Sequence, residues 1–170
     1  MLKNMYLNIK DVLLWILFFI LIIGFIFSQV KMEKHINISI DKVGKELSEH
    51  VEGEIKQENS LTFKKRYSLS PEEYKGIVYY GPVSNMNVEE VLLVEMKDSS
   101  QEYDLMKAME KRIEYQVTNF DGYGTDQLEL LDKAKIIFNG SYGVLIIAKN
   151  INNVENLYNK LIKEGEKNGI

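Results

Sequence analysis

The segment 135–148 reads KIIFNGSYGVLIIA, with β-rich runs on both sides of the pair Asn139-Gly140. An Asn-Gly pair between two such runs is the strongest short-range signal for a β-hairpin, because both turn residues must accept positive φ. The segment therefore predicts two antiparallel strands joined by a tight turn.

Two further strands are predicted upstream of this hairpin. The first covers 77–80, which reads IVYY and is closed by a Gly-Pro pair. The second covers 88–97, and its apolar run Val91–Val94 is typical of a strand that is buried on both faces. With the hairpin, these runs predict a sheet of about four strands.

The longest helix of this part is predicted over 98–120. Ser99 and Glu102 have the spacing of a capping box at its start. Its apolar stripe recurs at spacings of three and four residues and comprises Met106, Met109, Ile113, Val117 and Phe120. Shorter helical segments are predicted over 39–55 with Ser39 as N-cap, and over 61–69, 70–76, 125–131 and 154–165, with a loop at 56–60. The order of elements predicts an α+β fold: one two-layer domain, a mostly antiparallel sheet packed with helices.

The N-terminal part contains an uncharged run at 12–30, VLLWILFFILIIGFIFSQV. At about 1.5 Å per residue it would reach about 28 Å, close to the thickness of a bilayer core. The run therefore predicts a transmembrane anchor that contacts the lipid bilayer. A cleaved signal peptide is the alternative, but the run is long for one and lacks a small-x-small cleavage pattern.

This anchor gives the expected domain organisation. Residues 1–11 form a cytoplasmic tail, 12–30 the anchor, 31–60 a juxtamembrane helix and loop, and 61–170 the α+β domain. A short tail before a large C-terminal domain favours a single-pass protein of the cell membrane with an extracytoplasmic domain.

The composition and the spacing of reactive residues exclude several kinds of functional site. The chain has no cysteine, which excludes disulfides, thiolate metal sites and a cysteine nucleophile. Its net charge of −4 gives it no electrostatic reason to bind nucleic acid. His35 and His50 do not lie at metal-ligand spacing, and Ser141 falls in a hairpin turn rather than in a nucleophile elbow. The glycine-rich loop 121–126 lacks the ligand series of a calcium loop. We expect no catalytic residue, no metal site and no cofactor.

The stretch 111–127, KRIEYQVTNFDGYGTDQ, is the best candidate for a site. An Arg, two Gln and several aromatic side chains at a helix end can form a polar binding site or an interface hot spot. The candidate residues are Arg112, Tyr115, Gln116, Phe120, Tyr123 and Gln127. The structural alternative is that Arg112 bonds loop carbonyls while Phe120 and Tyr123 plug the sheet edge.

A basic triplet, Lys64-Lys65-Arg66, stands out in the acidic chain. Such a triplet is usually a solvated helix face, and an interaction patch is the alternative interpretation.

Several segments together resemble the bacterial domain-of-unknown-function family four-three-five-eight. The resemblance begins near Tyr67 and the segment 71–76, and continues through Tyr79-Tyr80 and 89–95. Its most specific part runs from 98–101 through Arg112 and Gln116 to Phe120, Gly122-Tyr123-Gly124 and Gln127, before the hairpin at 139–142. The resemblance implies a lipoprotein or membrane-anchored domain of Gram-positive bacteria, and no reaction. Many members carry a lipobox Cys, which this chain lacks.

Three functions are open at this point. The first is a non-catalytic accessory module that binds an envelope protein partner, for instance an O-acyltransferase that modifies envelope polymers. The second is an envelope enzyme that uses two carboxylates, drawn from Glu89, Glu90, Asp121 and Asp126. The third is a small-ligand sensor with an apolar pocket near Tyr79, Tyr123 and Tyr142.

Overall fold

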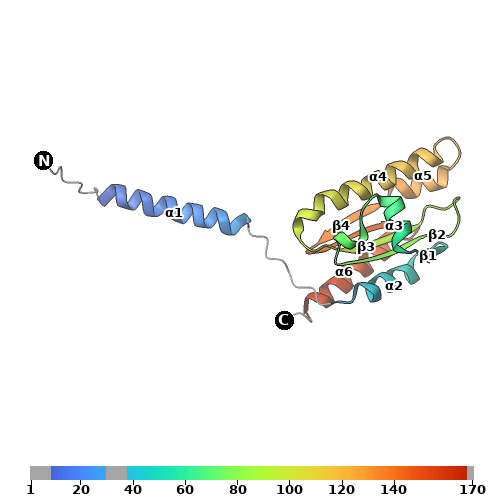
Figure 1. Ribbon diagram of the computed structural model, residues 1–170, viewed down its shortest axis with the longest axis horizontal. Coiled ribbons are helices and arrows are strands. Elements are labelled where there is room, and N and C mark those ends of the chain that lie inside the picture. The colour runs from blue at the N-terminus through green and yellow to red at the C-terminus, as the bar shows by residue number, and fades with distance from the viewer. Residues whose placement is uncertain (1–8, 30–37, 168–170) are drawn as a thin grey trace. The chain divides into compact units, whose positions relative to one another are not determined.

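The structure is a computed structural model that describes residues 9–29 and 38–167. The chain divides into two compact units, 1–33 and 34–170. The first contains the helix α1 (Ile9–Gln29), and the second contains every strand and all the other helices of the described residues (Figure 1).

The prediction of a transmembrane helix over 12–30 is wrong for the described part of the chain. None of the helices in 9–29 and 38–167 is both long enough and apolar enough to cross a bilayer. Within α1 the uninterrupted apolar run is 12–27, because Lys10 and Asp11 precede it and Ser28-Gln29 follow it. At about 1.5 Å per residue this run reaches about 24 Å, short of a hydrocarbon core of about 30 Å. The predicted tail at 1–8 lies outside the described residues.

The domain is built on one antiparallel sheet with the strand order β1-β2-β3-β5-β4. Its strands are β1 (Ile55–Gln57), β2 (Gly76–Pro82), β3 (Glu90–Glu95), β4 (Lys135–Asn139) and β5 (Tyr142–Ile147). The sheet has five strands instead of the four predicted, because the polar segment taken for a loop at 56–60 contributes the short edge strand β1. Its three residues pair with β2, with Lys56 opposite Gly81.

The Asn-Gly hairpin forms as predicted, with a different turn. Asn139 pairs with Tyr142, so the two loop residues are Gly140 and Ser141. Gly140 has φ of 56°, whereas Asn139 and Ser141 are not among the positive-φ residues of the described chain. Positive φ at the first loop residue alone is the requirement of a type II′ turn, in which glycine takes that position.

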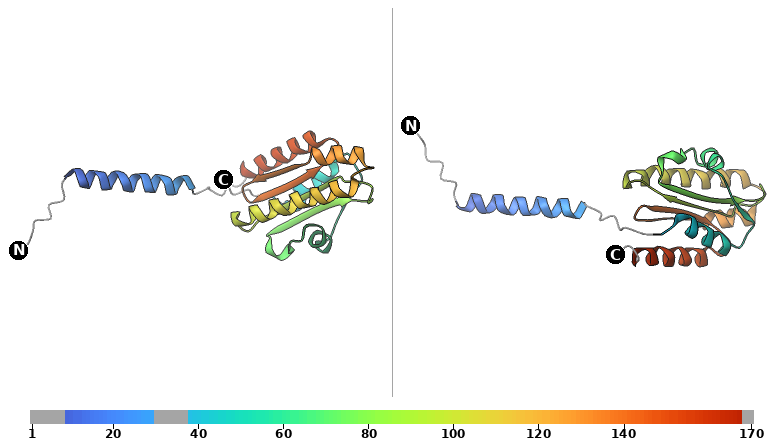
Figure 2. Two further views of the ribbon diagram at one scale, coloured as in Figure 1. Left: turned by 90° about the horizontal axis from the view of Figure 1, so that it is seen from above. Right: turned by 60° about the horizontal axis from the view of Figure 1, so that its bottom comes forward.

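Helices cover both faces of the sheet, so the domain has three layers and the prediction of two layers is wrong (Figures 1 and 2). One face carries α2 (Ile40–His50) and α6 (Ile151–Lys167), and the other carries α3 (Ser60–Tyr67), α4 (Glu102–Phe120) and α5 (Thr125–Asp132). The central strands β3 and β5 are buried along their whole length. Alternate residues of β3 therefore enter different cores: Val91 and Leu93 face α2 and α6, while Leu92 and Val94 face α4.

Helix starts show where the sequence signals held. Ser39 caps α2 as predicted, its hydroxyl accepting a bond from the amide of Lys42 at 3.4 Å. At the start of α4, Asp98 caps a short 3-10 turn, Ser99–Gln101, that leads into the helix. The amide of Ser100 donates to Oδ1 of Asp98 at 2.8 Å, so the capping box predicted for Ser99 and Glu102 is replaced by an aspartate cap one residue earlier. A second 3-10 turn, Pro71–Glu73, forms where the Ser-Pro start was predicted.

Candidate functional site

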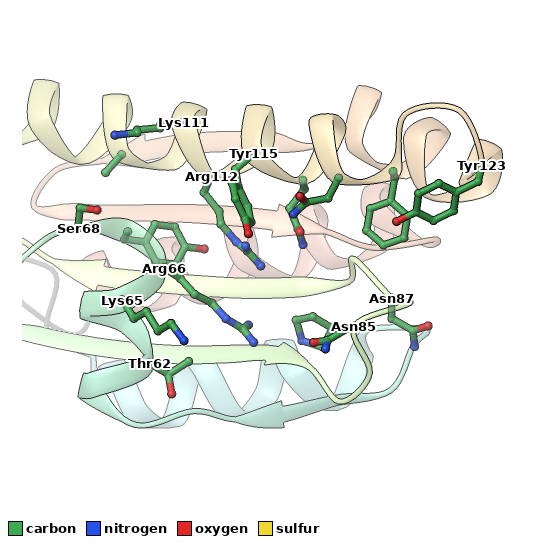
Figure 3. Close-up of a pocket in the computed structure, with 16 residues that line it drawn as sticks. Thr62, Lys65, Arg66, Ser68, Asn85, Asn87, Lys111, Arg112, Tyr115 and Tyr123 are labelled. Atoms are coloured by element: carbon green, nitrogen blue, oxygen red, sulfur yellow. The ribbon is translucent and has the colours of Figure 1, made fainter.

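The candidate site is a pocket of about 750 Å³ on the face that carries α3 and α4 (Figure 3). The helix α3 forms one wall, α4 and the turn after it form another, and the end of β2 with the following loop contributes a third. The lining residues are Thr62, Lys65, Arg66, Tyr67, Ser68, Pro82, Asn85, Asn87, Ala108, Lys111, Arg112, Tyr115, Gln116, Asn119, Phe120 and Tyr123.

Local sequence fixes both helical walls. The Asn59 side chain caps α3, accepting a bond from the amide of Thr62 at 2.9 Å. The helix ends at Ser68, which adopts the left-handed region with φ of 58°. This ending places Lys65 and Arg66 in the last turn, where the helix dipole favours positive charge. In α4, Arg112, Gln116 and Phe120 follow at intervals of four and therefore share one face.

The floor of the pocket is Arg112 of α4, which forms a buried ion pair with Glu90 of β3. Nη2 of Arg112 lies 2.7 Å from Oε2 of Glu90, and Nε lies 3.2 Å from each carboxylate oxygen. Glu90 is fully buried and Arg112 is 6% exposed. Burial lowers the pKa of Arg112, but the charge and hydrogen bonds of Glu90, together with Tyr67 and Tyr79, outweigh it, and the net pKa is raised. The guanidinium is therefore charged at any physiological pH.

Two tyrosine hydroxyls complete the shell of Glu90. Tyr67 donates to Oε1, and Tyr79 donates to Oε2 at 3.2 Å. Burial raises the pKa of both tyrosines, and the Glu90 carboxylate raises it further. Both therefore stay protonated as donors. Every oxygen of this buried carboxylate has partners, as a buried charge requires.

Arg66 continues the network toward the surface. Its Nη1 donates to the Tyr79 hydroxyl at 2.5 Å, and its Nη2 lies 3.7 Å from Oε1 of Glu58. The guanidinium carbon of Arg66 also lies 5.6 Å from the centroid of the Tyr79 ring, within cation–π range. In Figure 3 the side chain of Arg66 enters the pocket from the α3 wall and that of Arg112 enters it from the α4 wall. The two helical walls are thus tied together through Tyr79 and Glu90.

The pocket is basic although the chain as a whole is acidic. Lys65, Arg66, Lys111 and Arg112 line it, and its lining includes no Asp or Glu. Glu90 and Glu58 neutralise the two arginines from behind. Lys65 and Lys111 are in no salt bridge within the described residues. The pocket therefore keeps an excess of about two positive charges, which attracts anions.

The structure brings together most of the residues that were predicted as site candidates. Arg112, Tyr115, Gln116, Phe120 and Tyr123 line the pocket, whereas Gln127 in α5 does not. Tyr115 and Tyr123 are 60% and 65% exposed, while Arg112, Gln116 and Phe120 are buried.

The alternative interpretation, in which Arg112, Phe120 and Tyr123 serve only to hold the fold together, is half right. Arg112 does hold the fold together, but through the Glu90 carboxylate instead of loop carbonyls. Phe120 packs in the core, with its ring centroid 5.7 Å from that of Tyr123. The exposed Tyr123 therefore stands at the pocket rim and does not plug the sheet edge.

The residues proposed for an enzyme, a sensor or a metal site do not come together in one site among the described residues. The Glu90 carboxylate forms an ion pair with Arg112, and Oε1 of Glu89 lies 3.8 Å from Nζ of Lys149. None of the acids proposed for an enzyme lines the pocket. Tyr79 and Tyr142 belong to cores on opposite faces of the sheet, which separates the residues proposed for a sensor. Nδ1 of His50 bonds the carbonyl of Glu46, and His35 lies outside the described residues. No group of three or more potential metal ligands occurs among the residues described.

Several lining residues were not among the candidates from sequence. The α3 wall contributes Lys65 and Arg66, the loop after β2 contributes Asn85 and Asn87, and α4 contributes Lys111. The basic triplet at 64–66 was the available signal for the first wall, under its interaction-patch interpretation. Nothing in sequence spacing indicates that α3 and α4 would face each other across a pocket.

Comparison with known proteins gives a family and no activity. The model of the family described as Domain of unknown function (DUF4358) matches residues 48–148. No significant match was found to a curated protein or to a solved structure.

Proposed function

This chain belongs to the DUF4358 family, and on that premise we propose that it is a non-catalytic interaction module that binds an envelope protein partner at the pocket between α3 and α4. The observation that carries the proposal is the pairing of a rigid, buried polar floor with exposed aromatic side chains at the rim.

Protein interfaces concentrate their binding energy in Tyr, Trp and Arg side chains near a well-packed centre. Tyr115 and Tyr123 present such rings at the rim, and both are more than half exposed. Below them, Arg112 is held at two nitrogens by Glu90, so it loses little freedom when a partner binds. The pocket is therefore organised before its partner arrives.

The lining also favours binding over catalysis. It has no pair of carboxylates, no histidine and no cysteine among its residues. Its one serine, Ser68, ends α3 and has no neighbouring base within the lining. The polar groups that line it suit recognition better than proton transfer or nucleophilic attack.

The first test is co-purification of the full-length chain after mild crosslinking in cells. The test variant is Tyr115→Ala with Tyr123→Ala, and the matched control is Tyr103→Ala. Tyr103 is 62% exposed on the same helix but does not line the pocket. We expect the unmodified chain and the control to recover the same partner, with a polytopic O-acyltransferase as the first protein to look for. We expect the double variant to lose it while its circular dichroism spectrum is unchanged.

Equal recovery of the partner by the folded double variant would remove this pocket from the interface. Recovery of no specific protein by the unmodified chain would remove the accessory function itself.

The proposal includes an extracytoplasmic position for the domain. Because the chain has no cysteine, a single cysteine at an exposed position reports its side of the membrane. Asp132→Cys in α5 is suitable, since Asp132 is exposed and lies outside the pocket. A membrane-impermeant maleimide should label it in intact cells, and labelling only after lysis would place the domain in the cytoplasm.

A further inference from the structure

We propose that the pocket between α3 and α4 is the receptor for an acidic peptide segment, in which two neighbouring carboxylates bind Lys65 and Lys111. This inference rests on the proposed function, because it states the chemistry of the partner segment that enters the site.

The charges of the pocket are of two kinds. Arg66 and Arg112 already face internal carboxylates, Glu58 at 3.7 Å and Glu90 at 2.7 Å. Lys65 and Lys111 are exposed, and neither has a hydrogen bond or ion pair within the described residues. The internal acids thus leave two lysines without a counter-charge. A segment with two carboxylates supplies one for each.

The two lysines stand on different walls. Figure 3 shows Lys65 on the α3 side and Lys111 on the α4 side. Glu90 occupies Nε and Nη2 of Arg112, and Nη1 makes no hydrogen bond with a described residue. A ligand carboxylate in the middle of the pocket can therefore bond Nη1 of Arg112 while it is attracted by the lysine of either wall.

Amide side chains match a peptide backbone. Asn85 and Asn87 lie on the loop wall, and Gln116 and Asn119 lie on α4. A primary amide offers both a donor and an acceptor, so it can pair with the N–H and C=O of an extended peptide. Four such groups around one pocket supply contacts that do not depend on the partner's side chains.

Exposed apolar residues that are next in sequence to lining residues favour a peptide over a phosphate-bearing polymer. Leu61, Val83 and Met86 are 75%, 52% and 60% exposed, and each adjoins a lining residue in sequence. A peptide can cover them with its own apolar side chains, whereas a phosphodiester chain cannot.

The test uses fluorescein-labelled nonapeptide pools with Glu-Glu at the centre and randomised flanks. The matched pool has Gln-Gln at the centre, and poly(glycerol phosphate) is the competing polymer. Binding to the ¹⁵N-labelled full-length chain is measured by anisotropy and by amide shifts. We expect the Glu-Glu pool to bind about tenfold more tightly than the Gln-Gln pool, with shifts concentrated at Lys65, Lys111 and Asn119.

The variant Lys65→Gln with Lys111→Gln should lower the affinity for the Glu-Glu pool about tenfold. The control is Lys64→Gln with Lys163→Gln, which removes two exposed lysines that do not line the pocket and should change nothing.

Three results would overturn the inference: equal binding of the two pools, unchanged binding by the Lys65/Lys111 variant, or tighter binding of poly(glycerol phosphate). The last would assign the pocket to a phosphate-bearing polymer. In each case the crosslinking experiment decides separately whether a protein partner uses this face, so the two proposals can fail independently.

Discussion

Arg112 binds Glu90 side-on, with Nη2 2.7 Å from Oε2 and Nε 3.2 Å from both oxygens, and both side chains are buried. The pair joins the middle of α4 to the first residue of β3. Since Tyr67 from α3 also bonds Glu90, one carboxylate connects both helical walls of the pocket to the sheet. The shape of the pocket therefore depends on this pair.

The first prediction concerns the loss of one partner. Arg112→Met leaves the Glu90 charge buried with only tyrosine donors, and this should lower the free energy of unfolding by about 3–5 kcal/mol. Urea unfolding followed by circular dichroism measures the change. Replacing both residues, Arg112→Met with Glu90→Met, should restore most of the loss, because no buried charge is left. A double variant as unstable as the single one would contradict this explanation.

The second prediction concerns the contact between α2 and the sheet. A Cβ at Gly44 would lie 2.4 Å from Cγ1 of Val78 on β2, which is closer than atoms can approach. Gly44→Ala should therefore lower the free energy of unfolding by about 1–3 kcal/mol. Gly24→Ala is the control, since nothing lies within 4 Å of a Cβ at that helical glycine. Adding Val78→Ala to Gly44→Ala should cost less than the two single changes together.

The third prediction concerns alkaline pH. Burial raises the pKa of Tyr158 to about 12. An unfolded tyrosine titrates near pH 10, so between about pH 10 and 12 the unfolded state binds fewer protons than the folded one. The contribution of the protonated Tyr158 to the free energy of unfolding is thus fully present below pH 10 and is lost as the pH rises toward 12.

Tyr158→Phe tests this dependence. The hydroxyl of Tyr158 is buried without a hydrogen-bond partner among the described residues, so its removal should not lower stability at neutral pH. The variant should lose less stability than the parent between about pH 9 and 12, by on the order of 1–2 kcal/mol. An identical alkaline loss in both proteins would show that other groups, such as Tyr142, carry the effect.

The fourth prediction concerns the hairpin turn. Gly140 is exposed and has φ of 56°, so a β-branched side chain there is strained. Gly140→Val should lower the thermal midpoint by an amount that corresponds to about 1–2 kcal/mol. Gly140→Asn should cost less, because Asn tolerates positive φ. Ser141→Ala, at the other loop residue, is the control and should be close to neutral.

Local signals in the sequence predicted the elements that depend on local physics. The hairpin at 135–148 and the long helix α4 formed because turn chemistry and helical periodicity act over a few residues. The short strand β1 was missed because Ile55–Gln57 is too short and too polar to show alternation. Its strand conformation comes from pairing with β2, some 25 residues away in the chain.

The candidate site shows the same limit. Periodicity placed Arg112 and Gln116 on one helical face, but it did not show which group the guanidinium would meet. Glu90 stands in the run EEVLLVE, where a charge suggests an exposed strand end, and yet it is fully buried. An apolar stripe likewise shows that a helix packs on a sheet without showing which face it covers, and this is why two layers were predicted in place of three.

The helices α2 and α6, which cover one face of the sheet, lie mostly outside the segment that the family model matches. The family model spans 48–148, and so omits most of α2 and all of α6. Those two helices supply Val43, Leu47, Val154, Tyr158 and Leu161, which together shield one face of β3 and β5 from water. A gene fragment cut at the family limits would encode a sheet with one bare side. The segment that the family model matches is therefore shorter than the segment that builds the sheet with both of its helical layers.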